Sequence, residues 1–240
     1  MFDCHDLSPN FTIRVQGDAE SLDDSIGPKV EALWLEQSQD GDACLVNRRI
    51  FSLVDWSPSV LNGHFTEYKR YVAQSLHPML YEFLRIRPLA VTGCLNCKDG
   101  IVFGLRGPDV WQYPNTWELV PSGSIDCTAQ VTKELINPVF QILKELSEEV
   151  GISIPTESVT TNCFLIEDQR SRVVDLVFSL NSDLSAEQVC DAHAAKASDE
   201  YVRLEIVPVN SLPAVIAGNR LTIADASVVI LQRLHLLEKI

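Results

Sequence analysis

The sequence predicts an α+β fold in which short strands form sheets and amphipathic helices pack on them. Three observations indicate this class: short apolar runs separated by turn residues, two segments with apolar residues at helical spacing, and an average globular composition. With 46% hydrophobic residues and a mean hydropathy of +0.05, a chain of 240 residues can bury a large core. The composition excludes disordered, collagen-like and disulfide-rich miniprotein classes.

The first part of the chain, residues 1–85, reads as a small α+β module. Alternating apolar residues predict strands, and a helix with Tyr68, Tyr71, Val72 and Leu76 at helical spacing ends before His77-Pro78. The expected elements are a strand at 11–15, a helix at 28–34, strands at 43–46 and 50–54, and a helix at 65–76.

The second part, residues 86–240, reads as a sheet with helices. An Asp99-Gly100 pair takes positive φ readily, so it predicts a hairpin between the apolar runs on either side. The expected strands are 89–94, 101–105, 117–120, 163–166, 173–180 and 201–207, and the expected helices are 138–150 and 224–237.

Charge limits the partners. The net charge is −14 and the pI is near 4.7, so the surface repels nucleic-acid backbones and anionic membranes. A small anionic ligand stays compatible where a metal ion held by carboxylates reverses the local field. Seven scattered cysteines and an N-terminus without a signal peptide lead us to expect a cytoplasmic protein with reduced thiols. The sequence leaves the oligomeric state open.

The helix expected at 138–150 has clear ends. Asn137 can cap the free amides, Pro138 suits the first helical position, and Gly151 tolerates the left-handed conformation after the last turn. The apolar stripe consists of Val139, Leu143, Leu146 and Val150. At ~100° per residue, Glu145, Glu148 and Glu149 fall within an arc of roughly 100° on the opposite face and are expected to converge.

An acidic stripe of this kind is also typical of any solvated surface helix. The surrounding sequence favours a functional interpretation. Lys144 to Ile152 reads KELSEEVGI, and Trp117 to Gly123 reads WELVPSG. The first string resembles the Nudix box, G-x5-E-x7-R-E-U-x-E-E-x-G-U with U aliphatic, and the second resembles the approach to that box in the Nudix hydrolase superfamily.

The resemblance covers about residues 86–240. It implies an α/β/α sandwich with a mixed sheet, a Mg²⁺ or Mn²⁺ site on the box helix, and hydrolysis of a nucleoside diphosphate linked to another moiety. By position, Glu145, Glu148 and Glu149 match the family's metal-binding carboxylates, which also carry the catalysis. Gly123 matches the loop glycine, and Lys144 the box arginine, although lysine lacks the planar fork that braces the helix glutamates.

The spacing departs from the family pattern. Gly123 and Lys144 lie 21 positions apart, which is 7 more than the pattern allows. Ile136 stands where the upstream glutamate should be. The nearest carboxylate is Glu134, which the insertion either restores to the site or leaves as an exposed loop acid.

The stretched box after an N-terminal module resembles the subgroup that hydrolyses UDP-glucose and UDP-galactose, a match that rests on layout and on Phe65, Tyr68 and Trp117. Two alternatives stay open. One is a non-catalytic Nudix-fold module that binds nucleotides, which the insertion and the missing glutamate favour. The other is a hydrolase for another diphosphate such as ADP-ribose or coenzyme A.

Diphosphate hydrolysis needs charge neutralisation and an aimed water molecule, which a carboxylate-bound divalent cation supplies. Glu149 and Glu200 are the candidates for activating the water. Arg106 either clamps a phosphate or forms a surface ion pair. Trp111, Tyr113 and Trp117 either line a base or sugar pocket, with Trp117 expected to bind substrate, or belong to the core.

Other motifs carry no function. Cys94 and Cys97 form one CxxC without a second pair of metal ligands, and it marks a hairpin. His64, His77 and His193 form no catalytic constellation and are expected on the surface. The chain has no phosphate loop of the G-x4-G-K-S/T type and no G-x-G-x-x-G fingerprint.

Overall fold

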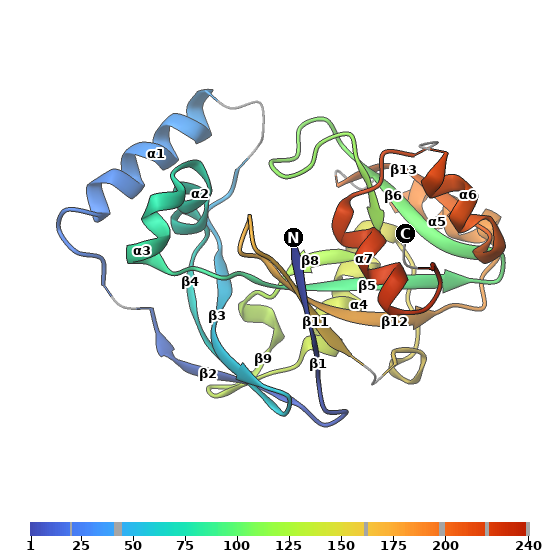
Figure 1. Cartoon of the computed structure of the whole chain (residues 1–240), viewed down its shortest axis with the longest axis horizontal. Helices are drawn as coiled ribbons and strands as arrows, with labels where there is room; N and C mark the ends of the chain where they lie inside the picture. Colours follow the sequence, from blue (N-terminus) through green and yellow to red (C-terminus); the bar gives the residue numbers. More distant parts are fainter. Residues whose placement is uncertain (20, 41–44, 161–162, 197–199, 219–220, 239–240) are drawn as a thin grey trace.

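A computed structural model describes residues 1–240 except 20, 41–44, 161–162, 197–199, 219–220 and 239–240. Its centre is an eight-stranded mixed sheet, the large sheet, with the order β1-β11-β12-β5-β6-β13, while β7 pairs with β6 and β8 with β5 (Figure 1). β12 and β5 are parallel. The strands are β1 (Phe2–Asp6), β5 (Leu89–Cys97), β6 (Gly100–Arg106), β7 (Trp117–Leu119), β8 (Ser122–Ser124), β11 (Phe164–Asp168), β12 (Val174–Asn181) and β13 (Tyr201–Val207).

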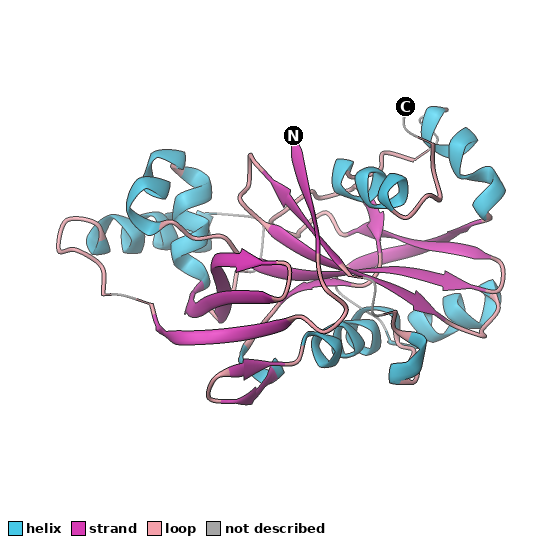
Figure 2. Ribbon diagram, turned by 60° about the horizontal axis from the view of Figure 1, so that its bottom comes forward, coloured by secondary structure: helices cyan, strands magenta, loops and turns pink. Residues whose placement is uncertain are grey.

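Helices cover both faces of the large sheet (Figure 2). On one face α4 (Pro138–Glu145) and α5 (Ala186–Lys196) bury Ile142 and Val189 against the strands. On the other, α6 (Leu212–Ala217) and α7 (Asp225–Arg233) bury Leu212 and Ile230. The predicted sandwich, with a mixed sheet between two helical layers, is therefore confirmed.

A five-stranded mixed sheet, the small sheet, has the order β3-β4-β2-β10-β9. Three helices of the N-terminal half lie beside it, at the left in Figure 1. The strands are β2 (Thr12–Asp18), β3 (Arg49–Ser57), β4 (Val60–Glu67), β9 (Gln130–Thr132) and β10 (Leu135–Ile136), and the helices are α1 (Gly27–Asp40), α2 (Tyr68–Leu76) and α3 (Tyr81–Leu84).

We call α4 together with the turn that follows it, residues 138–150, the box helix. The residues between Gly123 and the box helix include a hairpin in the small sheet. Leu135 pairs with Arg14 of β2, and the Val15 N–H donates to the Glu134 carbonyl at 2.9 Å. In the other direction, β1 pairs with β11 of the large sheet. Strand pairing thus crosses residue 85 twice, and the division into 1–85 and 86–240 stays a prediction.

The helix expected at 65–76 is wrong in its first three residues. Phe65 belongs to β4, where it pairs with Phe51 of β3 and is buried with its ring 5.4 Å from the Phe51 ring. Leu61, Gly63 and Phe65 are all buried, so the two-residue period of a strand continues up to α2. Of the strand expected at 43–46, residues 43 and 44 lie outside the described residues, and 45 and 46 are not in a strand.

The hairpin predicted around Asp99 is confirmed. β5 and β6 pair through Cys97 and Gly100, and Gly100 has φ +147°, with the carbonyl oxygen of Val207 2.2 Å from where a Cβ would lie. Cys94 and Cys97 are buried in β5. Within the described residues, no helix is long and apolar enough to cross a membrane.

Candidate active site

The box helix begins and ends as the sequence predicts. The Asn137 side chain accepts hydrogen bonds from the N–H groups of Val139 and Phe140 at 3.1 and 3.2 Å. After Glu145 the helix widens into a π-helical turn over Leu146–Val150, and Gly151 ends it with φ +78°. π-helical turns occur often at functional sites.

The three box glutamates do not share one environment. Glu149 is only 5% exposed, and its carboxylate accepts a hydrogen bond from the Ser122 N–H at 3.0 Å. Glu145 is half-buried and accepts from the Gln141 amide at 2.5 Å. The Glu148 side chain is 55% exposed, with Lys144 4.0 Å away. Two acids therefore point toward the sheet and the third toward solvent.

This placement corrects the expectation that all three converge opposite the apolar stripe. Leu146, Glu149 and Val150 are all buried in the π-helical turn, so burial there is not confined to the predicted apolar stripe. Among the residues that the structure describes, no three His, Cys, Asp or Glu side chains are grouped closely enough to hold a metal ion. The assignment of all three glutamates as metal ligands stays a prediction.

The surroundings of the two inward-facing acids, Glu145 and Glu149, disfavour their ionised forms. Burial raises the pKa of Glu149 well above its ordinary value, and the charges of Glu200 and Glu145 add to this effect. Burial likewise raises the pKa of Glu145 to about 7, against the opposing effect of its hydrogen bond with Gln141. Carboxylate oxygens in such a setting suit Mg²⁺ or Mn²⁺, because a divalent cation stabilises their ionised forms. The donor chemistry of Glu145 and Glu149 thus fits a divalent cation.

Gly123 lies directly against the box helix. It belongs to β8 and not to a free loop, and it pairs with Val91 of β5. A Cβ at this position would stand 2.4 Å from Cδ and 2.5 Å from Oε1 of Glu145. The glycine therefore leaves room for the Glu145 carboxylate, which gives the box glycine a physical role in this chain.

Lys144 has a partner outside the helix. Its ammonium group donates to Asp126 Oδ2 at 2.7 Å, in the segment that follows β8. It therefore ties the helix to that segment, whereas the box arginine was expected to brace the helix glutamates.

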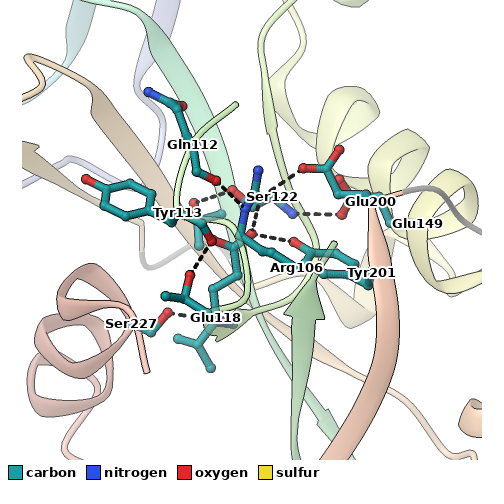
Figure 3. Close-up of polar contacts among 12 residues, drawn as sticks. Arg106, Gln112, Tyr113, Glu118, Ser122, Glu149, Glu200, Tyr201 and Ser227 are labelled. Carbon is teal, nitrogen blue, oxygen red and sulfur yellow. Dashed lines mark hydrogen bonds and ion pairs between the residues drawn. The ribbon is translucent and has the colours of Figure 1, made fainter. Parts of the chain in front are cut away.

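Arg106, at the end of β6, is the centre of a polar network (Figure 3). Its guanidinium contacts Glu118 at 2.6 Å and Glu200 at 2.9 Å, and its Nε donates to the Gln112 carbonyl at 2.8 Å. The Tyr201 hydroxyl donates to the same Glu118 oxygen at 2.7 Å. The Arg106 side chain is 12% exposed, so its ion pairs are not on the open surface, and its role as a phosphate clamp stays a prediction.

Two of the aromatic residues that the sequence analysis singled out, Trp111 and Tyr113, lie in the segment between β6 and β7. Tyr113 is 52% exposed, and its hydroxyl lies 3.5 Å from Asp168. The side chain of Gln112 donates to the Tyr71 hydroxyl at 2.9 Å, which joins this segment to α2. Trp117 is 5% exposed in the core, with Arg203 4.9 Å above its ring, so its expected contact with substrate stays a prediction that this burial does not favour.

Two acids escaped the sequence analysis. Glu118 was visible only as part of the WELVPSG string, although its charge reaches both Glu149 and Asp175. Asp175 interrupts the apolar run of β12 and accepts from the Thr92 hydroxyl at 2.9 Å, while that hydroxyl lies 3.3 Å from the Ser122 hydroxyl. The signal that could have found Asp175 is a carboxylate inside an otherwise apolar strand.

Two further expectations are settled by position. Glu134 is exposed between β9 and β10, as a loop acid would be. The expectation that His193 lies on the surface is wrong. His193 is buried in α5, and its Nε2 lies 3.0 Å from the Tyr201 carbonyl oxygen. It packs under the start of β13, a tertiary contact that its sequence neighbours do not indicate.

Comparison with known proteins gives fold-level likenesses. No protein-family model and no curated protein sequence matches the chain. Solved structures similar to it include the Nudix domain of NrtR from Shewanella oneidensis in complex with ADP ribose, at 13% identity over 62% of this chain and 86% of that chain, with a TM-score of 0.42. A Nudix hydrolase from Nitrosomonas europaea has 14% identity over 62% of this chain and 88% of that chain, with a TM-score of 0.41.

A bifunctional NMN adenylyltransferase/ADP ribose pyrophosphatase from Francisella tularensis has 17% identity over 70% of this chain and 48% of that chain, with a TM-score of 0.45. This chain therefore matches about half the length of the bifunctional enzyme. At such identities and TM-scores the likeness says nothing about the substrate of this chain.

Proposed function

We propose that this chain is a Nudix-type hydrolase that cleaves the diphosphate bond of a nucleoside diphosphate joined to a second group, with Mg²⁺ or Mn²⁺ as cofactor. The observation that carries the proposal is the pair of inward-facing box acids. Glu145 lies against Gly123, and Glu149 is bound to the Ser122 N–H, with the pKa of each raised by burial. Two such acids on one helix end suit a cation more than they suit protein stability.

In this proposal Glu145 and Glu149 would hold the cation together with Glu148, whose side chain is 55% exposed. A cation bound there would supply charge neutralisation and would lower the pKa of the attacking water. Glu149 or Glu200 accepts the proton of that water. The water oxygen bonds to one phosphorus while the bridging P–O bond breaks, which gives a nucleoside monophosphate and a phosphorylated second product.

The substrate we propose is a UDP-sugar such as UDP-glucose, which would yield UMP and a sugar 1-phosphate. The stretched box and the preceding N-terminal region support this choice. ADP-ribose and coenzyme A are the competing diphosphates. A cytoplasmic location fits the reduced thiols of the buried Cys94 and Cys163.

The test is a phosphorus NMR screen of UDP-sugars, ADP-ribose, coenzyme A and dinucleoside polyphosphates with Mg²⁺ or Mn²⁺. We expect metal-dependent turnover of at least one compound. Glu148→Gln and Glu149→Gln should each lower that turnover by at least ~100-fold, because loss of a positioned charge costs several kcal/mol in the transition state. Glu157→Gln, on the exposed surface, is the control.

A normal rate in both glutamate variants would contradict the metal role of the box helix. Tight binding of a nucleotide sugar without any change in its phosphorus spectrum would instead support the non-catalytic module. The absence of a group of three close acids in the described residues is the observation that favours this second function.

A further inference from the structure

Near residue 126, the N-terminal half contacts the segment that Lys144 of the box helix binds. Ile50 of β3 forms a bridge with Asp126, and the Phe51 N–H donates to the Ile125 carbonyl at 2.9 Å. Asp126 is also the residue that Lys144 of the box helix binds. The beginning of β3 and the residues just before it therefore lie beside the candidate active site.

Arg48 stands two positions before Ile50 at this junction. Its backbone carbonyl accepts the N–H of Tyr68 at 2.8 Å, which fixes the start of α2 beside it. Tyr68 is half-buried, with its ring 6.1 Å from the Tyr71 ring. The Tyr71 hydroxyl in turn accepts the hydrogen bond from Gln112, so α2 and the segment after β6 are in contact.

The charge of Arg48 acts on groups of the candidate active site. Its charge opposes the burial that raises the pKa of Glu145. The pKa of Tyr68 is raised by burial, and the charges of Arg48 and Arg106 oppose that rise while Glu200 adds to it. The charge of Arg48 thus reaches both Glu145 and Tyr68, and those of Arg106 and Glu200 reach Tyr68 as well.

The cations at this site differ in their partners. Arg106 is bound to Glu118 and Glu200, and Lys144 is bound to Asp126. The Arg48 side chain is exposed, and within the described part of the chain no carboxylate forms an ion pair with it. In a protein with a net charge of −14, an exposed guanidinium beside an acidic site is well placed to receive a phosphate, because its planar fork matches phosphate oxygens.

We propose that the N-terminal half supplies one wall of the substrate site, in which Arg48 binds a phosphate of the nucleoside diphosphate and the Tyr68 ring stacks on its base. This inference rests on the proposed function. It assigns the choice of nucleotide to the start of β3 and of α2, whereas the box helix carries the chemistry. A flat aromatic ring next to a guanidinium offers the two contacts that a nucleotide needs, one for its base and one for its phosphates.

The test uses the full chain with the variants Arg48→Ala, Arg48→Lys, Tyr68→Ala and Tyr68→Phe. On the substrate that the NMR screen identifies, Arg48→Ala should raise KM by about tenfold or more with a smaller change in kcat, because it removes hydrogen bonds to a charged group. Arg48→Lys should fall between Arg48→Ala and the unchanged chain, since a lysine keeps the charge but loses the fork. Tyr68→Phe should behave as the unchanged chain, and Tyr68→Ala should raise KM.

Arg14→Ala, an exposed arginine on β2, is the matched control and should leave KM unchanged. Thermal unfolding by circular dichroism checks that all variants are folded. If the unchanged chain is active and the folded Arg48→Ala and Tyr68→Ala variants keep its KM, this inference is overturned while the proposed hydrolysis stands.

A second readout does not need turnover. Calorimetric titration with UDP and Mg²⁺ should show weaker binding to Arg48→Ala and Tyr68→Ala than to Arg14→Ala. If the unchanged chain hydrolyses nothing in the screen but these two variants bind UDP less tightly, the proposed hydrolysis fails while the binding wall is supported. Equal UDP affinity in all variants contradicts the proposal that Arg48 and Tyr68 bind the nucleotide.

Discussion

Asp175 shows how one buried carboxyl group can make the stability of the fold depend on pH. Burial raises the pKa of its carboxyl group to about 6 from an ordinary 3.8, although the hydrogen bond from Thr92 acts in the opposite direction. Between these values the folded chain holds a proton that the unfolded chain releases. The stability that this group contributes is therefore complete below about pH 4 and is lost as the pH rises through about 6.

We accordingly predict that Asp175→Asn, which keeps an acceptor for Thr92, reduces the dependence of stability on pH. At each pH we take the free energy of unfolding of Asp175→Asn minus that of the unchanged chain. This difference should be roughly 1–2 kcal/mol larger at pH 7.5 than at pH 4.5. Urea unfolding at the two pH values measures this difference. Asp109→Asn, at an exposed position, is the control, and an equal pH dependence in all three proteins would refute the prediction.

At the scale of elements, the contact between β8 and α4 decides where the Glu145 carboxylate lies. Gly123→Ala would place a methyl group within 2.4 Å of Glu145 Cδ. Because the end of that side chain can move, we expect a change in stability of no more than ~1 kcal/mol. The displaced carboxylate should nevertheless lower turnover by at least ~10-fold, since misplacing a catalytic group by about 1 Å has a large kinetic cost.

Ser124→Ala in the same strand is the matched control, with turnover measured on the substrate found by the NMR screen. Full activity in folded Gly123→Ala would show that the close approach of β8 to the helix has no catalytic role. A large loss of stability would show instead that the Glu145 side chain cannot move away from the added methyl group.

At the scale of the molecule, the two halves share their sheets. β1 completes the edge of the large sheet against β11, and β10 extends the small sheet against β2. One core cluster contains both Phe51 of β3 and Leu146 of the box helix. Such sharing predicts cooperative unfolding, because neither half keeps its sheet without the other.

We therefore expect the urea unfolding curves from far-ultraviolet circular dichroism and from tryptophan fluorescence to coincide. Trp56 and Trp117 lie in different sheets, so the fluorescence reports on both halves. Two separated transitions would contradict the prediction and would support independent domains divided near residue 85.

The sequence by itself determined the local features of this protein. The ends of the box helix follow from Asn137, Pro138 and Gly151, whose backbone preferences act within a few residues. The β5–β6 hairpin follows from the Asp99-Gly100 turn in the same way. The expectation of a sandwich came from the resemblance of residues 117–123 and 144–152 to the Nudix pattern.

Only the tertiary structure decided which glutamate is buried, what Lys144 and Arg106 bind, and where the extra hairpin pairs. Glu148 and Glu149 are neighbours in sequence, yet one faces solvent and the other faces β8, because the packing of the π-helical turn sets their burial. Arg48 shows the same limit. No local pattern marks it, and its place beside the box helix depends on a bridge between residues 50 and 126, far apart along the chain.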